Sequence, residues 1–445
     1  MYKKQEGRDV ITVGFALFAM FFGAGNLIFP PYLGLVSGSN WLVGFICYII
    51  VDAGLAMVTV VTMVKCGGQL SGVTGRIGRR CSILVGVAVA LCIGPMLAIP
   101  RTAATAFEVG IEPMGLDNRV LFSAIYFVAA FFLTVRSTAV VDIVGKFLTP
   151  LLLVGLTVMI IVGVVAPIGP IVEKAGMDIV ASDGITSGYQ TLDAFAALLF
   201  SMIIIQSVEG KGYLGERQSG FVLKTCILAG AALFFVYGGL TYLGATVSDL
   251  IGADISHSAL LIYITKEILG YPGVVLLGVV VVLACLTTVI GLTASISTYF
   301  SELSGGRISY KTLVSVIMAI GFTLSCLGLN TIVSLSAPVL NTLYPMVLVL
   351  ILLSLFKKQV KNDNIVKGAA FTALAVSILN TADGFGLSIP LLHVLPLYQF
   401  GLNWILPAVG GGFLGNLIKM RPQAEEKREQ KSEPCREGGV LEKAE

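Results

Sequence analysis

The stretch MFFGAGNLIFPP, from Met20 to Pro31, is the most informative part of this chain. It lies within the first long apolar segment, residues 10–36, so two glycines, an asparagine and a proline pair interrupt a helix at membrane depth. In hydrocarbon each unpaired backbone N–H or C=O group costs several kcal/mol, so an interrupted helix persists only where protein buries it or where it surrounds a bound solute. The interruption predicts a solute-binding site. The competing interpretation is a kink or a tight helix-packing site.

The composition is that of a polytopic membrane protein. Of the 445 residues, 56% are hydrophobic and 12% are charged, and the mean hydropathy is +0.92, whereas soluble proteins contain about 25% charged residues. Apolar segments that can span a hydrocarbon core of about 30 Å predict an all-α fold with about twelve transmembrane helices. These segments lie at residues 10–36, 41–64, 82–107, 119–135, 147–166, 189–208, 221–247, 273–300, 312–328, 331–356, 366–382 and 402–419.

The basic residues predict the orientation, because Lys and Arg gather in cytoplasmic loops. If the N-terminus is cytoplasmic, all 29 basic residues fall on the cytoplasmic side except Arg101, Arg119, Lys174 and Lys266. A miscounted helix would invert every later loop and remove this separation. We therefore expect a multi-pass protein with both termini in the cytoplasm, and we do not read the net charge of +3 as a sign of nucleic-acid binding.

Four stretches resemble those of a known family. They are GFALFAMFFGAGNLIFPP (Gly14 to Pro31), LCIGPMLAIPRTAATAFEVG (Leu91 to Gly110), TLDAFAALLF (Thr191 to Phe200) and SAPVLNTLYP (Ser336 to Pro345). They are similar to those of the branched-chain amino acid:cation symporters, the BrnQ-type family. The resemblance implies import of leucine, isoleucine and valine with Na⁺ or H⁺ across a bacterial inner membrane. It implies no enzymatic activity and no cofactor or metal beyond the coupling ion. It also implies that the protein is embedded in the lipid bilayer and has no obligate protein partner.

The resemblance also implies the LeuT-like fold, in which helices one to five and six to ten form inverted repeats and helices one and six are discontinuous. The expected organisation has six parts. They are a cytoplasmic N-terminus (1–9), the first repeat (10–166), an extracellular loop (167–188), the second repeat (189–356), two further helices (357–420) and a disordered cytoplasmic tail (421–445).

The interrupted first helix is suited to an amino acid substrate. An exposed helix N-terminus offers free N–H groups and the positive end of the helix dipole to a carboxylate, so we expect Ala24 and Gly25 to be main-chain donors. Asn26 adds a side-chain oxygen. For the apolar side chain of the substrate we expect Phe200 and Ser201, at the presumed break in helix six, to contribute to the pocket.

A cation site is expected where the first half-helix ends. The carbonyl groups near Ala19 and Phe22 present the negative end of a helix dipole. In helix eight, the GLT triplet resembles the sodium-site segment of LeuT-like transporters, which makes Thr293 the first candidate side chain, with Ser295 and Thr288 as substitutes because Ala294 replaces the second hydroxyl of that segment. The competing interpretation is that these hydroxyls bond to the carbonyl four residues earlier.

Three further charged residues are singled out. Asp52 falls near the middle of a span, where an ionisable group is costly enough to suggest a function, here possible proton coupling. Its alternative is a structural side chain bonded to a hydroxyl in a polar cavity between helices. Arg101 and Glu108 lie two turns apart on nearly one helix face, which suggests either an outer gate or side chains that extend to the membrane interface.

Three other functions are alternatives to branched-chain amino acid symport. A cation-coupled carrier of the same fold for other amino acids or nucleobases is the nearest alternative. An intramembrane enzyme would need a nucleophile and base or a metal cluster at membrane depth, but the two histidines, His257 and His393, fall in predicted outer loops. A passive channel would show solute flux without dependence on an ion gradient.

Overall fold

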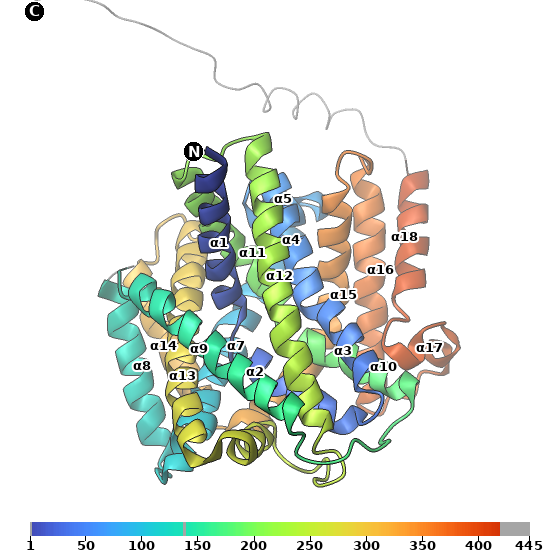
Figure 1. Ribbon diagram of the computed structural model, residues 1–445. Helices are drawn as coiled ribbons and strands as arrows, with labels where there is room; N and C mark the ends of the chain where they lie inside the picture. The colour runs from blue at the N-terminus through green and yellow to red at the C-terminus, as the bar shows by residue number, and fades with distance from the viewer. Residues whose placement is uncertain (1, 137–138, 419–445) are drawn as a thin grey trace, which may run out of the picture.

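Helices make up the structure, a computed structural model that describes residues 2–136 and 139–418. Within these ranges the only β-structure is an isolated bridge between Gly38 and Glu173. Figure 1 shows the long helices standing side by side, and the start of α1 (Tyr2–Phe21) lies at the same end of the bundle as the end of α18 (Ile405–Leu417).

The helices fall into an order that follows the apolar segments of the sequence. Their bounds are α1 Tyr2–Phe21, α2 Ala24–Ser37, α3 Trp41–Ile49, η1 Ile50–Gly54, α4 Leu55–Lys65, α5 Leu70–Thr74, η2 Gly75–Ile77, α6 Arg79–Leu91, η3 Cys92–Met96, α7 Ala98–Thr105, η4 Ala106–Ile111, η5 Glu112–Met114, α8 Arg119–Arg136, α9 Ala139–Val165, α10 Met177–Gln190, α11 Asp193–Gly210, α12 Glu216–Ala245, α13 His257–Leu303, α14 Tyr310–Ser325, α15 Leu329–Leu355, α16 Asp363–Gly384, α17 Pro390–Val394, η6 Tyr398–Phe400 and α18 Ile405–Leu417.

Length and hydropathy identify the membrane-embedded part of the bundle. In the described ranges, seven helical stretches are long and apolar enough to cross a membrane, and the pair α1 and α2 forms an eighth if it counts as one crossing. Four more apolar helices are shorter, at Arg119–Val135, Leu152–Val165, Tyr310–Ser325 and Ile405–Leu417. The protein is therefore an all-α, multi-pass membrane protein.

The first helix breaks where the sequence predicts. Helix α1 ends at Phe21, helix α2 begins at Ala24, and the two are bent by 72°. Gly23 has an extended conformation, and no side chain caps the N-terminus of α2. Because two glycines flank Ala24 and no capping side chain is present, the first N–H groups of α2 remain open to the space beside the bend.

The second break lies elsewhere than expected. Helix α11 runs without interruption through Phe200 and Ser201, so the prediction of a break there is wrong. The chain instead breaks at Thr191 and Leu192, between α10 and α11, and Leu192 has a positive φ of 69°. Most of the predicted loop 167–188 belongs to helix α10. The Gly, Asp and Ser residues of this segment suggested a loop, but the segment is helical and packs closely on α3.

Close backbone contact holds the outer half-helix α2 in place. A Cβ atom on Gly34 of α2 would overlap the carbonyl oxygen of Thr241 in α12, and one on Gly244 of α12 would overlap the carbonyl oxygen of Pro31. Small residues allow two helices in a membrane to approach this closely. The position of α2 relative to α12 is thereby fixed on one side of the break.

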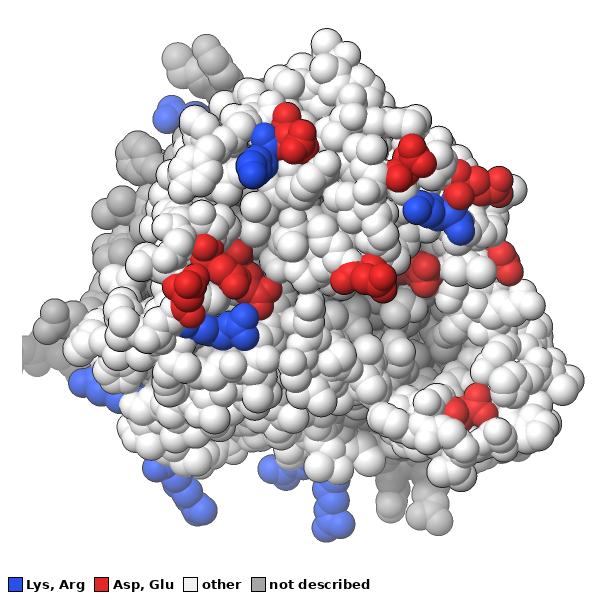
Figure 2. Space-filling view, turned by 90° about the horizontal axis from the view of Figure 1, so that it is seen from below, with Lys and Arg blue, Asp and Glu red and all other residues white. Residues whose placement is uncertain are grey.

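Acidic side chains gather at one end of the bundle. Figure 2 shows the end opposite the N-terminus, where acidic side chains gather in several patches and basic side chains accompany some of them. The predicted disordered tail, residues 421–445, lies outside the described residues.

Candidate substrate and cation site

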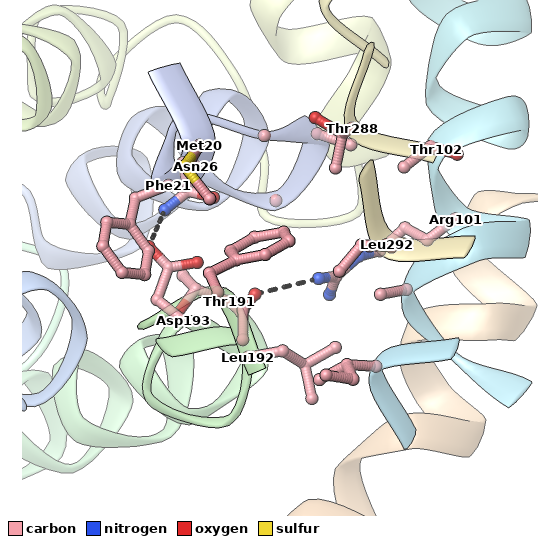
Figure 3. A pocket seen from close by; sticks show the side chains of 17 residues that line it. Met20, Phe21, Asn26, Arg101, Thr102, Thr191, Leu192, Asp193, Thr288 and Leu292 are labelled. Carbon is pink, nitrogen blue, oxygen red and sulfur yellow. Dashed lines mark hydrogen bonds between the residues drawn. The ribbon is translucent and has the colours of Figure 1, made fainter. Parts of the chain in front are cut away.

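A cavity lies between the two helix breaks. Its walls come from the end of α1, the start of α2, the α10–α11 junction, η3 with α7, and the middle of α13 (Figure 3). Its volume is about 40 Å³, which is room for about three water molecules. Binding of an amino acid therefore requires some of the surrounding side chains to move.

The N-terminus of α2 forms one wall of the cavity. Gly23, Ala24, Gly25 and Asn26 all line it. The predicted donors Ala24 and Gly25 are thus placed at the cavity, where free N–H groups and the positive end of the helix dipole can interact with an anion. Their role in substrate binding stays a prediction.

Arg101 lines the cavity beside the start of α2 and is the main residue that the sequence did not place correctly. Its side chain is 3% exposed, and its guanidinium donates to the carbonyl oxygens of Gln190 and Thr191, at 3.2 Å for Thr191. A Cβ atom on Gly25 would lie 3.2 Å from Nη2 of Arg101. Its Nε has no hydrogen-bond partner. Arg101 therefore brings a positive charge to the two breaks and does not extend to the membrane interface.

Glu108, the predicted companion of Arg101, has a different role. It accepts hydrogen bonds from Arg119 at 3.3 Å, from the Ser258 hydroxyl at 2.7 Å and from the backbone N–H of Leu329 at 3.0 Å. These contacts join the beginnings of α8, α13 and α15. Arg101 and Glu108 therefore have separate hydrogen-bond partners, and an outer gate formed by the two stays a prediction.

Asn26 connects two buried carboxyl groups. Its Nδ2 donates to Oδ2 of Asp193 at 2.9 Å and lies 3.5 Å from Oδ2 of Asp52, and the two carboxyl groups interact directly. The Thr191 hydroxyl lies 2.8 Å from Oδ1 of Asp52 and 2.7 Å from the carbonyl oxygen of Gly188. Asp52 is fully buried and Asp193 is 4% exposed. Asp52 thus has the hydroxyl neighbour that its structural interpretation requires, and also a second acid that the sequence did not indicate.

Of the three hydroxyl side chains predicted for a cation site, Thr288 lines the cavity, whereas Thr293 and Ser295 do not. The Thr288 hydroxyl donates to the carbonyl oxygen of Ala284 at 3.0 Å. Ser295 donates in the same way to Gly291 at 2.9 Å. Thr293 is fully buried and its hydroxyl has no hydrogen-bond partner. Of the three hydroxyls, Thr293 is the one left free for a ligand.

The remaining predicted residues divide between the cavity and its surroundings. Phe200 is 3% exposed and lines the cavity. Ser201 is fully buried, does not line the cavity, and donates to the carbonyl oxygen of Ala197. At the end of α1, Met20 and Phe21 line the cavity, whereas Ala19 and Phe22 lie behind them.

Side-chain clusters suited to a transition metal are absent from the part of the chain that the structure describes. No group of three or more His, Cys, Asp or Glu side chains there is arranged so that it could hold a metal ion. The oxygen atoms of the aspartates, Asn26 and Thr293 are ligand types for hard monovalent cations and protons.

Comparison with known sequences decides the family. The family described as branched-chain amino acid transport protein matches residues 6–421. The chain belongs to this family. The branched-chain amino acid permease BrnQ of Bacillus subtilis is 32% identical, over 94% of this chain and 99% of its own length. The branched-chain amino acid transport system 3 carrier protein of Pseudomonas aeruginosa is 35% identical, over 91% and 94%.

Solved structures agree on the fold. The inward-facing conformation of Mhp1 has a TM-score of 0.62 and 15% identity, covering 95% of each chain. A Na⁺-coupled sialic acid symporter has a TM-score of 0.60 and 13% identity, covering 92% of this chain and 89% of its own. These likenesses show that the chain has a LeuT-like fold, as the sequence resemblance implied. The family that matches the chain and its named relatives are transport proteins.

Substitution of Gly25 by leucine tests the importance of the open N-terminus of α2. The larger side chain would displace the Arg101 guanidinium, and a displacement of about 1 Å at a binding site can cost about 100-fold in rate. We expect leucine uptake by Gly25→Leu to fall about 100-fold while the variant still inserts in the membrane. Gly220→Leu in α12 is the control, because a Cβ atom there meets nothing within 4 Å. Wild-type uptake by Gly25→Leu would contradict the assignment.

Proposed function

We propose that this chain imports leucine, isoleucine and valine across a bacterial inner membrane by symport with Na⁺ or H⁺, using alternating access around the cavity. The proposal is supported by family membership and by one structural observation. The cavity between the two helix breaks is lined by a basic residue, Arg101, and by an acidic residue, Asp193. Such a pair of opposite charges at membrane depth is costly unless it serves a function.

The charges match the two ends of a zwitterion. A substrate carboxylate is bound by the N–H groups of Ala24 and Gly25 together with Arg101, which adds charge-assisted hydrogen bonds. The substrate ammonium group lies toward Asp193 and the side-chain oxygen of Asn26. A neutral nucleobase would leave both charges unpaired, so this arrangement favours an amino acid over the nucleobase alternative.

The apolar side chain of the substrate occupies the remaining wall. Phe200, Ala196, Leu292 and Ile93 line the cavity there and provide an apolar surface. Ser201 follows Phe200 in the sequence. In this proposal it does not contact the substrate and contributes only to the packing of α11. A difference of one methylene changes binding by only about 1 to 3 kcal/mol, so such a pocket accepts all three branched side chains.

The coupling cation has a candidate site near the end of α1. Carbonyl groups at Ala19 and Phe22 and the free hydroxyl of Thr293 are the proposed ligands for Na⁺, with Thr288 and Ser295 as neighbouring oxygen atoms. The buried, unpartnered state of the Thr293 hydroxyl supports its selection, because a buried hydroxyl without a partner is costly. The acid Asp52 provides a separate position for a proton.

In the proposed topology the chain crosses the membrane twelve times. Seven long helices, the bent pair and the four shorter apolar helices together make twelve crossings, with both termini cytoplasmic. The two discontinuous helices, α1–α2 and α10–α11, then occupy the first position of each five-helix inverted repeat. Placing both breaks at the centre of the membrane is what alternating access in such repeats requires.

Leucine uptake into proteoliposomes tests the function. With inward Na⁺ and H⁺ gradients imposed separately, we expect accumulation of radiolabelled leucine under at least one gradient, reduced by excess isoleucine or valine. The reason is that only a symporter converts an ion gradient into solute accumulation. Leucine flux that merely equilibrates under both gradients would indicate a channel, and uptake of other amino acids without competition by leucine would contradict the substrate.

Replacement of Thr293 by valine tests the sodium site. Valine keeps the shape but removes the oxygen, and loss of one contributing group weakens a metal site about 10- to 100-fold. We expect the Na⁺ concentration that gives half-maximal leucine uptake to rise by about tenfold or more. Thr298→Val is the matched control, because Thr298 lies on the same helix with an exposed side chain that bonds to Ala294. Identical Na⁺ activation curves for wild type and Thr293→Val would reject this ligand.

A further inference from the structure

We propose that Asp52 and Asp193 together bind one coupling proton, which the two carboxyl groups share in the closed site. This inference rests on the proposed function and deepens it, because it names the pair of groups through which a proton gradient drives import. Asp52 comes from η1 and Asp193 from the first turn of α11, so the proton would sit where the second helix break meets the bundle interior.

The contacts of the two carboxyl groups indicate that the pair holds one proton. The Thr191 hydroxyl donates to the carbonyl oxygen of Gly188 and to Oδ1 of Asp52, and the Oδ2 atoms of Asp52 and Asp193 both lie at the Asn26 amide. An ionised carboxylate can only accept a hydrogen bond. Because the two carboxyl groups interact directly, and two carboxylates that share a site do not both ionise, one proton lies between them.

The surroundings of the pair suit a proton better than a metal cation. Asn26 directs its Nδ2, a donor, toward both carboxyl groups, whereas Na⁺ needs acceptor oxygens on all sides. Tyr48 is fully buried beside Asp52, and its hydroxyl makes no hydrogen bond of normal geometry. It is therefore available to a carboxyl group whose protonation changes.

A count of charges gives one proton. The ionisable groups that face the pair are Arg101 from α7, Tyr48 from α3, Tyr237 from α12 and Tyr344 from α15. With neutral tyrosines, two ionised aspartates and one arginine leave a single uncompensated negative charge. One proton on the pair removes it, and a zwitterionic substrate leaves the balance unchanged.

Asn26 links the proton to the substrate. Its Nδ2 contacts the acid pair, while its Oδ1 lies 3.8 Å from the position of a Cβ atom on Gly23, at the bend that lines the cavity. A substrate that fills the cavity also displaces water. An ionised Asp52 is then desolvated and costly, so the loaded site closes only with the proton bound, whereas water in the empty site allows the ionised form to return.

The transfer itself is simple. In the outward-open state one carboxyl group of the pair forms an O–H bond with a proton from external water, and in the inward-open state that bond breaks and the proton passes to internal water. No oxidant, reductant or other reactant is involved.

Asp52→Asn tests the proposal, because asparagine resembles the protonated acid but cannot release a proton. In Na⁺-free proteoliposomes, we expect the variant to exchange labelled leucine for internal leucine at a rate close to that of wild type. We also expect it to lose accumulation driven by a pH gradient and to lose leucine-dependent acidification, measured with an internal pH dye. Asp178→Asn, an exposed position in the first turn of α10, is the control and keeps all three activities.

The outcomes separate the two proposals. Wild-type protein that does not exchange leucine would reject the proposed function itself. Wild-type protein that exchanges leucine but shows no proton movement, or Asp52→Asn that still accumulates leucine under a pH gradient, would overturn the proton assignment alone. Loss of exchange in a folded Asp52→Asn variant would also overturn it. If Asp52→Asn does not fold, Asp52→Glu is the second test variant. Because glutamate is titratable, the proposal requires this variant to retain pH-driven accumulation of leucine with a shifted pH profile.

Discussion

The hydrogen bonds from Arg101 to the carbonyl oxygens of Gln190 and Thr191 are the interaction on which the rest of the site depends. Helix α10 ends there inside the bundle, and its last carbonyl groups have no helical partner. A guanidinium satisfies them and also matches the negative end of the helix dipole. The same group lies against Gly25 at the start of α2. One buried cation thus connects both helix breaks and leaves its Nε free beside the cavity.

This arrangement explains why the charged residues of the site occur together. Arg101 stabilises the α10 terminus but is itself costly at membrane depth, and Asp193 in the first turn of α11 offsets its charge. Asp193 in turn shares the Asn26 amide with Asp52. The two breaks, the acid pair and the cavity therefore form one electrostatic unit, to which a zwitterion can be added without changing the net charge.

The first break was predictable from sequence because its cause is local. Gly23, Gly25 and the proline pair that follows are signals that a single sequence contains, and they also place Ala24 and Asn26 at the cavity. The second break was not predictable, because the sequence around Leu192 contains no such signal. Leu192 takes a left-handed conformation that is unfavourable for leucine. Tertiary contacts, including the hydrogen bonds from Arg101, compensate for the cost of this conformation. Because polar α10 resembles a loop, the predicted span begins at residue 189, and Asp193 falls close to its start instead of in the middle of a helical stretch. The position of Arg101 is mispredicted for a similar reason, because its helical stretch continues to Met114.

The most direct measurement is a cryo-electron microscopy structure of the protein in lipid nanodiscs with leucine bound. The account predicts leucine between the two breaks, its carboxylate within hydrogen-bond distance of the α2 N-terminus and the Arg101 guanidinium, and its ammonium group toward Asp193. A continuous helix through Gly23 and Gly25, or leucine bound away from Arg101 and Asp193, would contradict it.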